Sequence, residues 1–487
     1  MDRRTFSQLA AASLGAAATG ACQSLGTARN VGDPTQMGIR ELHEAFSARE
    51  LDPVAVAEEF LARIEATQPT INAYSFVNRD GAIADAQAAR QRFANGTAIG
   101  PLDGIPLAFK DQYQVAGMQR RFGSALRASS AVDLQDEEVV ARMRAAGCVI
   151  LGKTTQCDEG ALSLSRSSAT GNTRNPAARD CHAGGSSSGS GAAAAARLGP
   201  IQMGADQGGS IREPASLTGC FGFKPSTGLI PLVSEYGVYG PIAAQLADIR
   251  PVLETASGRS LVRTDLNLSE LRIAYMPYCG DGMPPDPAVK ESCAQAIDRL
   301  NSSGLKVTEV EPPLPYGVLK EMATPFYAGG ISQIVSDFGF EAVLAQGERC
   351  FAKHVEATSK LDANLIRQLS EPAFGILDQA LETHPVHDYD IVLTPTLSFR
   401  AFPLERCHPV EAEATPDFDS WVARYGLSQE HSVALAIATY MKTPEITFPV
   451  ARRKSEKPVG LSAVASREED ALLLEFAELV EPMLVDG

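Results

Sequence analysis

Short apolar runs follow amphipathic segments repeatedly along this chain. Three pairs of this kind are present: helix 135–147 with strand 148–152, helix 192–198 with strand 201–205, and helix 286–301 with strand 305–310. Continuous apolar runs of this length are typical of strands that are buried on both faces and need helices to cover them. The alternation therefore predicts an α/β protein, with helices on both faces of a sheet.

Other helices are indicated by their end signals. Asp52 and Pro53 supply a capping residue and a first-turn proline for a helix that runs to about Ala66. An Ala-rich helix is expected at 80–94, and a C-terminal one from Glu468. No change of composition divides residues 36–487, so we expect one large domain. Within it, segment 315–440 is richer in helical pattern, which suits a region that faces the substrate.

Charge and hydrophobicity narrow the classes of partner. The formal net charge is −16, spread along the chain, and 44% of the residues are hydrophobic. Nucleic acids and anionic membranes both bind basic surfaces, so we expect neither as a partner. Past the N-terminus no apolar run is long enough to span a bilayer.

The first residues are typical of an export signal. Arg3 and Arg4 precede an Ala-rich apolar stretch that ends in small residues before Cys22. We interpret 1–21 as a twin-arginine signal peptide and 22–35 as a linker, which predicts a periplasmic protein. A core helix that begins with two arginines is the alternative. A lipoprotein with a lipid anchor at Cys22 is also left open, although the usual leucine is missing.

Cysteines and histidines give little support for a metal site. The nine cysteines include no Cys-x-x-Cys pair, so they are expected as scattered core residues, with one or two disulfides if the chain is exported. The nearest approach to a metal cluster is His384, His387, Cys407 and His408. We expect no metal and no other cofactor.

The candidate chemistry lies in two glycine-rich loops and one strand. Ser186 lies in the loop 183–191 and Ser210 in the loop 204–212. Lys110 ends an apolar run that follows the turn at 100–104. Together they offer a hydroxyl nucleophile, a second hydroxyl to relay a proton and an amine base. A hydrolase that uses no histidine needs this set of groups.

The first loop also fits another motif. Residues 185–189 match Gly-x-Ser-x-Gly, the nucleophile elbow, with Ser187 as the nucleophile. That elbow requires a strand immediately before it, and 172–183 is polar and contains a proline. The elbow is therefore the weaker interpretation. A phosphate-binding P-loop is excluded because no Gly-Lys-Ser/Thr closes the loop.

A series of ordered motifs resembles the amidase signature family, most densely over 102–248. The matching pieces are Gly104-Ile105-Pro106-x-x-x-Lys110-Asp111, Gly152-Lys153-Thr154, Asn175-Pro176, Gly184-Gly185-Ser186-Ser187, Asp206-x-Gly208-Gly209-Ser210-Ile211-Arg212-x-Pro214-Ala215, Gly219-x-x-Gly222-x-Lys224-Pro225 and Gly240-Pro241. The resemblance implies a single α/β domain around a mixed β-sheet.

The resemblance also implies roles for individual residues. Ser210 would be the nucleophile, Ser186 the bridging serine in a cis peptide, and Lys110 the base. Backbone N–H groups of three residues would bind the oxyanion: Gln207, Gly208 and Gly209. Three others would support the loops: Ser187, Asp206 and Arg212. Lys110 must be neutral to accept a proton, so its pKa should be lowered by an apolar setting.

The function implied is hydrolysis of a small or aryl amide through an acyl-enzyme. Esters and carbamates pass through the same tetrahedral chemistry and remain alternatives. Two further classes are a glutaminase component of a tRNA-dependent amidotransferase and a periplasmic binding protein without activity. A homodimer is left open. The chain departs from the family pattern at Arg120-Arg121 and at 442–445, and both departures are expected to alter substrate access.

Overall fold

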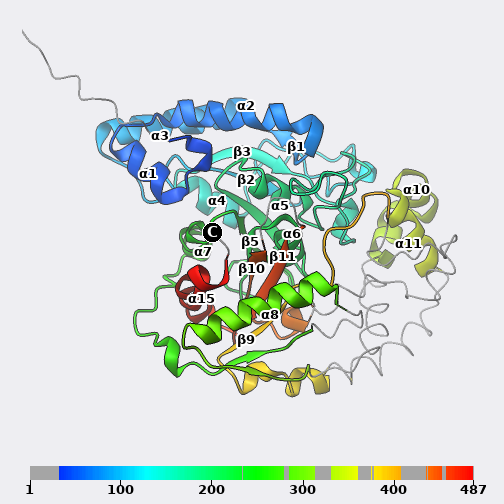
Figure 1. Cartoon of the computed structure of the whole chain (residues 1–487). Coiled ribbons are helices and arrows are strands. Elements are labelled where there is room, and N and C mark those ends of the chain that lie inside the picture. Colours follow the sequence, from blue (N-terminus) through cyan, green and yellow to red (C-terminus); the bar gives the residue numbers. More distant parts are fainter. Residues whose placement is uncertain are drawn as a thin grey trace, which may run out of the picture. The chain divides into compact units, whose positions relative to one another are not determined.

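The computed structural model describes residues 32–485, except 233, 279–284, 313–330, 360–374, 376–377, 407–434, 436 and 452–456 (Figure 1). From Gly32 onward the chain forms one compact unit. The predicted signal peptide and most of the predicted linker therefore lie outside the described residues. Within the described part, no helix is both long and apolar enough to cross a membrane.

A single eleven-stranded sheet organises the described residues. Its order is β1-β3-β2-β4-β6-β5-β10-β11-β9-β7-β8. The strands are β1 (Tyr74–Val77), β2 (Pro106–Lys110), β3 (Val149–Thr154), β4 (Ile201–Asp206), β5 (Phe221–Lys224), β6 (Val238–Ala243), β7 (Ile273–Tyr275), β8 (Val307–Glu309), β9 (Ile391–Pro395), β10 (Glu445–Ala451) and β11 (Val459–Val464). β2 pairs in parallel with β3 and β4, and β7 with β8 and β9, whereas the other neighbours are antiparallel. The expected mixed sheet is confirmed.

Helices surround this sheet, and most of the predicted ones are present. They are α1 (Ile39–Ser47), α2 (Pro53–Ile71), α3 (Arg79–Asn95), α4 (Glu138–Ala145), α5 (Ser188–Ala195), α6 (Arg212–Thr218), α7 (Ile249–Ser257), α8 (Pro287–Ser302), α10 (Phe340–Gln346), α11 (Arg349–Ser359) and α15 (Asp470–Leu484). Residues 331–338 are also helical. The Asp52 side chain caps α2 as predicted, but the helix continues to Ile71 rather than ending near residue 66.

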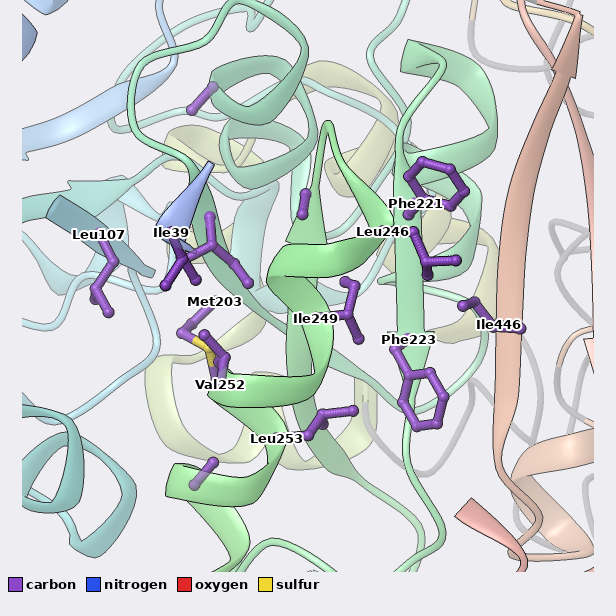
Figure 2. Close-up of a cluster of buried hydrophobic side chains, with 14 of the residues drawn as sticks. Ile39, Leu107, Met203, Phe221, Phe223, Leu246, Ile249, Val252, Leu253 and Ile446 are labelled. Atoms are coloured by element: carbon purple, nitrogen blue, oxygen red, sulfur yellow. The ribbon is translucent and has the colours of Figure 1, made fainter. Parts of the chain in front are cut away.

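The central strands of the sheet have one apolar face and one polar face. Figure 2 shows Met203, Phe223 and Ile446, from β4, β5 and β10, gathered with Ile249 and Leu253 of α7. Successive strand residues point to opposite faces, so the residues next to these in sequence face the other way. On that opposite face lie α5 and α6, and the polar strand residues Lys110, Asp206, Lys224 and Glu445 are directed there. The candidate site is therefore built on the α5/α6 face.

Helix α5 begins earlier than predicted. We expected helix at 192–198 after a glycine-rich loop, but α5 spans Ser188–Ala195 and is buried along almost its whole length. A Cβ atom on Gly189 would lie 2.3 Å from the backbone oxygen of Ala73 and the backbone nitrogen of Thr155. The glycine thus lets the helix approach the sheet closely, so the second half of the glycine-rich segment is packed helix rather than loop.

The segment 315–440 differs in part from the prediction. Its described residues include the expected helices at 331–338, α10 and α11. It also contains β9, which lies inside the sheet between β11 and β7. Because β9 is a fully buried strand, this segment is partly sheet rather than only a region that faces the substrate. Residues 313–330 and 407–434 lie outside the described residues.

Candidate active site

Lys110, Ser186 and Ser210 form one hydrogen-bonded chain. Lys110 is the last residue of β2, and its Nζ donates to Ser186 Oγ at 2.6 Å. Ser186 Oγ in turn donates to Ser210 Oγ at 3.0 Å. These residues are 76 and 24 positions apart in sequence. The three candidate residues that the motifs singled out are thus brought together by the fold.

Ser186 lies two residues before the start of α5, on the polar face of the sheet. The Gly185–Ser186 peptide bond is cis, as the family resemblance implied. The Ser186 side chain is buried, whereas Ser210 is partly exposed. Of the two hydroxyls, that of Ser210 is therefore the one within reach of an incoming molecule.

The loop that carries Ser210 is shaped by Asp206, the last residue of β4. The Asp206 carboxylate accepts hydrogen bonds from the backbone N–H of Gly209 at 2.8 Å and of Ile211 at 3.0 Å. Gly209 has a φ of 111°, a conformation that residues with a side chain rarely adopt. A Cβ atom there would also lie 2.3 Å from Leu435 Cδ1. Asp206 and Gly209 together hold the backbone on both sides of Ser210.

Arg212 anchors the same loop from α6. Its guanidinium donates to both Asp206 oxygens, at 2.9 and 2.8 Å, and to Glu445 Oε2 at 2.5 Å. All three side chains are buried. Burial acts to raise the pKa of Asp206, but the charge and hydrogen bonds of Arg212 outweigh it and lower the pKa to about 2. The predicted supporting residues Asp206 and Arg212 thus form an ion pair, and Glu445 binds the same guanidinium as a second carboxylate.

The Lys110 amine is set up to lose its proton near neutral pH. Lys110 is buried at the end of an apolar strand, and burial disfavours the charged ammonium form. Burial lowers its pKa to about 8, against the opposing influence of Cys157 and Asp206. A substantial neutral fraction is therefore present in mildly alkaline solution, as the sequence interpretation required.

Of the predicted oxyanion-binding residues, two face a cavity and one does not. Gln207 and Gly208 line a cavity of about 350 Å³ together with Ser210. The N–H of Gly209 instead donates to Asp206, so it is already used within the loop. The prediction that Gly209 offers its N–H to an oxyanion is therefore not supported by this geometry. The turn that positions Ser210 already uses the Gly209 N–H in its hydrogen bond to Asp206.

The cavity beside Ser210 has both apolar and charged walls. Its other described lining residues are Phe122, Arg127, Glu159, Gly160, Ala161, Leu162, Ser163, Ile331, Gln333, Ile334 and Asp337. Arg127 and Glu159 form an ion pair at 2.8 Å. Sequence reasoning missed both, because they lie between the recognisable motifs and carry no pattern of their own. Part of the segment 315–440 does line the cavity, through residues 331–337.

The two departures from the family pattern do not line the described cavity. Arg120 pairs with Asp133 at 2.9 Å, and Arg121 is not among the lining residues. In the segment 442–445, Glu445 binds Arg212 and the carbonyl of Thr443 accepts from Lys224. The expected effect on substrate access is therefore not supported for the second departure, since its polar groups stabilise the core beneath the loop of Ser210.

The predicted cluster of histidines and cysteines is described only in part. His384 Nδ1 accepts from the N–H of Val386, so this histidine caps a short turn. Across the described residues no group of three potential metal ligands is found, and Cys407 and His408 lie outside them. Five described cysteines carry free thiols: Cys148, Cys157, Cys181, Cys220 and Cys293. Cys350 is disulfide-bonded.

Comparisons with known proteins show which family this chain resembles. The model of the family described as Amidase matches residues 55–474. An acylamidase of Rhodococcus erythropolis is 29% identical over 472 residues, which cover 92% of this chain and 96% of that protein. A glutamyl-tRNA(Gln) amidotransferase component of Azoarcus sp. (strain BH72) is 45% identical over 304 residues, or 56% of this chain and 61% of that protein. A solved structure described as "Crystal structure of amidase" has a TM-score of 0.76 at 25% identity and covers 92% of this chain and 100% of that one.

Proposed function

The chain belongs to the amidase signature family and hydrolyses carbon–nitrogen bonds other than peptide bonds, and from that premise we propose that it cleaves a small or aryl amide through an acyl-enzyme on Ser210. The observation that carries this proposal is the continuous contact from Lys110 Nζ through Ser186 Oγ to Ser210 Oγ. Esters and carbamates would react at the same centre, because they pass through the same tetrahedral intermediate.

In the first half of the reaction Ser210 is the nucleophile. Its Oγ attacks the carbonyl carbon, its proton passes to Ser186 Oγ, and the Ser186 proton passes to neutral Lys110. With Lys110 neutral, the same two contacts are made with the hydrogen-bond direction reversed, so no heavy atom has to move. The N–H groups of Gln207 and Gly208 are the proposed donors to the oxyanion, which they stabilise as its charge develops.

The second half of the reaction returns the proton. The intermediate collapses when the C–N bond breaks, and the amine leaves with a proton delivered from Lys110 through Ser186. Water then attacks the acyl carbon, giving its proton to the same relay, and the carboxylic acid is released as Ser210 recovers its proton. No cofactor enters this sequence, since every step is a proton transfer or an acyl transfer.

A panel of substrates tests the proposal. Wild-type protein is incubated with aliphatic, aryl and peptide amides, and with matching esters and carbamates, while the released amine or alcohol is measured. Release of amine from a small or aryl amide, abolished in Ser210→Ala but retained in Ser188→Ala, is the expected result. Ser188 is the matched control because its hydroxyl donates to the carbonyl of Leu164 and takes no part in the relay. Amine release by Ser210→Ala would contradict the proposal.

A second candidate is the glutaminase component of a tRNA-dependent amidotransferase. The 45% identity to the Azoarcus protein over 304 residues favours it. The predicted export signal speaks against it, because tRNA-dependent amidation takes place in the cytoplasm. Glutamine hydrolysis that requires added partner proteins, with no turnover of other amides, would favour this candidate over a free amidase.

We also propose that the protein is exported to the periplasm, either as a free protein or held at the membrane by a lipid anchor at Cys22. The support is the sequence of residues 1–21 together with the disulfide at Cys350. Disulfides persist mainly in oxidising compartments such as the periplasm. Radiolabelled palmitate on the purified protein, lost in Cys22→Ser, would establish the anchor.

A further inference from the structure

Gln156 is a buried residue whose side chain has no hydrogen-bond partner among the described residues. It lies two positions after the end of β3 and is 1% exposed. Neither its Oε1 nor its Nε2 makes a hydrogen bond within the described part of the chain. Buried amides are almost always hydrogen-bonded, because removing one from water without a partner is costly. Both ends of this carboxamide are therefore free to bind another molecule.

Gly160 shows that this carboxamide lies beside the serine relay. Gly160 lines the cavity together with Ser210. Ser186 Oγ lies 3.5 Å and Gln156 Nε2 lies 3.7 Å from the position that a Cβ atom on Gly160 would take. The two groups thus lie on the same side of Gly160 and close to one point, yet they are not bonded to each other. A polar atom that reaches Ser186 from the cavity therefore comes close to Gln156 as well.

During amide cleavage, the atom that must approach Ser186 Oγ is the leaving nitrogen. In the proposed mechanism Ser186 delivers the proton as the C–N bond breaks, so the lone pair of that nitrogen has to face the Ser186 hydroxyl. The N–H of the same nitrogen then points in another direction and requires an acceptor. The Gln156 carboxamide supplies one, since rotation about its last side-chain bond exchanges the positions of Oε1 and Nε2.

The other polar side chains at this position are less suitable acceptors. Cys157 Sγ donates to the carbonyl of Leu162 at 2.8 Å and accepts from its N–H at 3.4 Å, so the thiol is already engaged. Glu213 Oε1 accepts from the N–H of Gly185 at 3.3 Å. Burial raises the pKa of Glu213 well above its ordinary value, so its second oxygen carries a hydrogen. Gln156 is left as the neutral group with a free acceptor.

We infer that Gln156 accepts a hydrogen bond from the N–H of the leaving amine, turns the nitrogen lone pair toward Ser186 and thereby favours amides over esters. This inference rests on the proposed acyl-enzyme mechanism at Ser210. The nitrogen takes the proton of Ser186 Oγ on its lone pair, the C–N bond breaks with its electrons passing to nitrogen, and Ser186 recovers a proton from Lys110. Gln156 keeps its own hydrogens throughout. An ester oxygen has two lone pairs and no hydrogen, so it can face Ser186 without this contact.

The test compares an amide with the ester of the same acyl and aryl groups. The amide is the best aryl amide of the substrate panel, beginning with 4′-nitroacetanilide and its ester 4-nitrophenyl acetate. The quantity measured is kcat/KM, because it covers acylation, the step in which the amine leaves. Gln156→Met has a similar volume without the amide. It should lower kcat/KM at least about tenfold for the amide, the size expected for one neutral hydrogen bond, and by no more than about threefold for the ester. Gln156→Leu should act in the same direction.

Stability and covalent labelling distinguish this role from a purely structural one. Because the amide of Gln156 has no partner among the described residues, Gln156→Met should unfold at the temperature of the wild type or higher. A fluorophosphonate should label Ser210 in this variant at an unchanged rate, since that reagent expels fluoride and no amine. Gln202→Met is the matched control, because Gln202 is also buried but its Nε2 donates to the carbonyl of Gly199 at 3.5 Å. It should leave the amide-to-ester ratio unchanged.

Two results would overturn the inference. One is an unchanged amide-to-ester ratio in Gln156→Met. The other is a lower unfolding temperature in that variant together with equal losses for amide, ester and fluorophosphonate, which would assign Gln156 a structural role. The proposed function is decided by the wild type alone: amide turnover supports it whatever the ratio does in the variants, and failure to cleave any amide of the panel contradicts it.

Discussion

The hydroxyl of Ser187 is held by the backbone of Ala205, although Ser187 is the immediate neighbour of Ser186. Ser187 Oγ donates to the carbonyl of Ala205 at 3.1 Å and accepts from its N–H at 3.2 Å. This hydroxyl therefore joins the start of α5 to β4 and is fully buried. No strand precedes it at 172–183, so the geometry of a nucleophile elbow is absent from these described residues.

Covalent labelling should distinguish the two serines. A fluorophosphonate is expected to label the wild-type protein and Ser187→Ala, but not Ser210→Ala, because only Ser210 combines partial exposure with a contact to Ser186. Intact-protein mass spectrometry measures the added mass, and peptide mapping locates it. Labelling that disappears with Ser187 and persists without Ser210 would support the elbow instead.

The rate should depend on the protonation of Lys110. Catalysis needs the neutral amine, and burial lowers the Lys110 pKa to about 8, so kcat/KM should rise as pH increases through about 8. Lys110→Ala should lower the rate at least ~10²-fold, in the range of general-base effects. Lys110→Arg should be no better, since a guanidinium stays protonated. Steady-state kinetics across pH 6–10, with about half-unit steps, measure all three. Near-wild-type turnover by the arginine variant would exclude Lys110 as the base.

Removing Arg212 should destabilise the protein strongly. Arg212→Met leaves the carboxylates of Asp206 and Glu445 buried without their partner, which costs ~3–5 kcal/mol of unfolding free energy in comparable cases. Glu445→Gln is the matched variant, because its side-chain oxygen can still accept from Arg212 while the pair with Asp206 remains. Its loss should be smaller, about 1 kcal/mol. Urea unfolding of the three proteins gives the comparison, and equal losses in both variants would contradict this view of the network.

Asp248 should make stability depend on pH. Its Oδ1 accepts from the N–H of Ile39 at the start of α1, and its Oδ2 is buried without a partner among the described residues. Burial raises the pKa of Asp248 to about 7, against ~3.9 in an unfolded chain. Between those values the folded state binds the proton more strongly, so the contribution of Asp248 to stability falls as pH rises from about 4 to about 7.

Asp248→Asn removes this titration while keeping an acceptor for Ile39. The variant should be close to wild type at about pH 4 and more stable than wild type at about pH 8, which flattens the dependence of stability on pH. Urea unfolding at both values is the measurement. Asp265→Asn, at an exposed carboxylate, is the control. A wild-type slope in Asp248→Asn would show that another group carries the effect.

Export should depend on the paired arginines. Replacing Arg3 and Arg4 with lysines should leave the protein in the cytoplasm, because the twin-arginine pathway reads that pair. Fractionation of cells and immunoblotting of the periplasm test this, with a cytoplasmic enzyme as the control for leakage. Unchanged export of the lysine variant would refute the twin-arginine interpretation.

Local sequence was sufficient to select three candidate groups that the fold brings into contact. Lys110, Ser186 and Ser210 each lie in a short motif with glycine nearby, and these motifs can be read in order along the chain. The helix–strand alternation predicted the α/β class for a similar reason, since burial on both faces forces continuous apolar strands. Boundaries were less certain: α5 starts four residues early because its small residues pack against β-strands that lie far away in the sequence.

Tertiary structure alone decided what surrounds those groups. Arg127 contacts Glu159 and Phe338 beside the cavity, and Arg212 of α6 binds Glu445 of β10. Neither partnership leaves a periodicity or a motif, because each joins residues on separate elements whose proximity depends on strand order. The same holds for the lowered pKa of Lys110, which follows from how completely the other elements bury it. Composition and spacing specify which groups are available, whereas distance, burial and charge between remote residues arise only when the sheet is assembled.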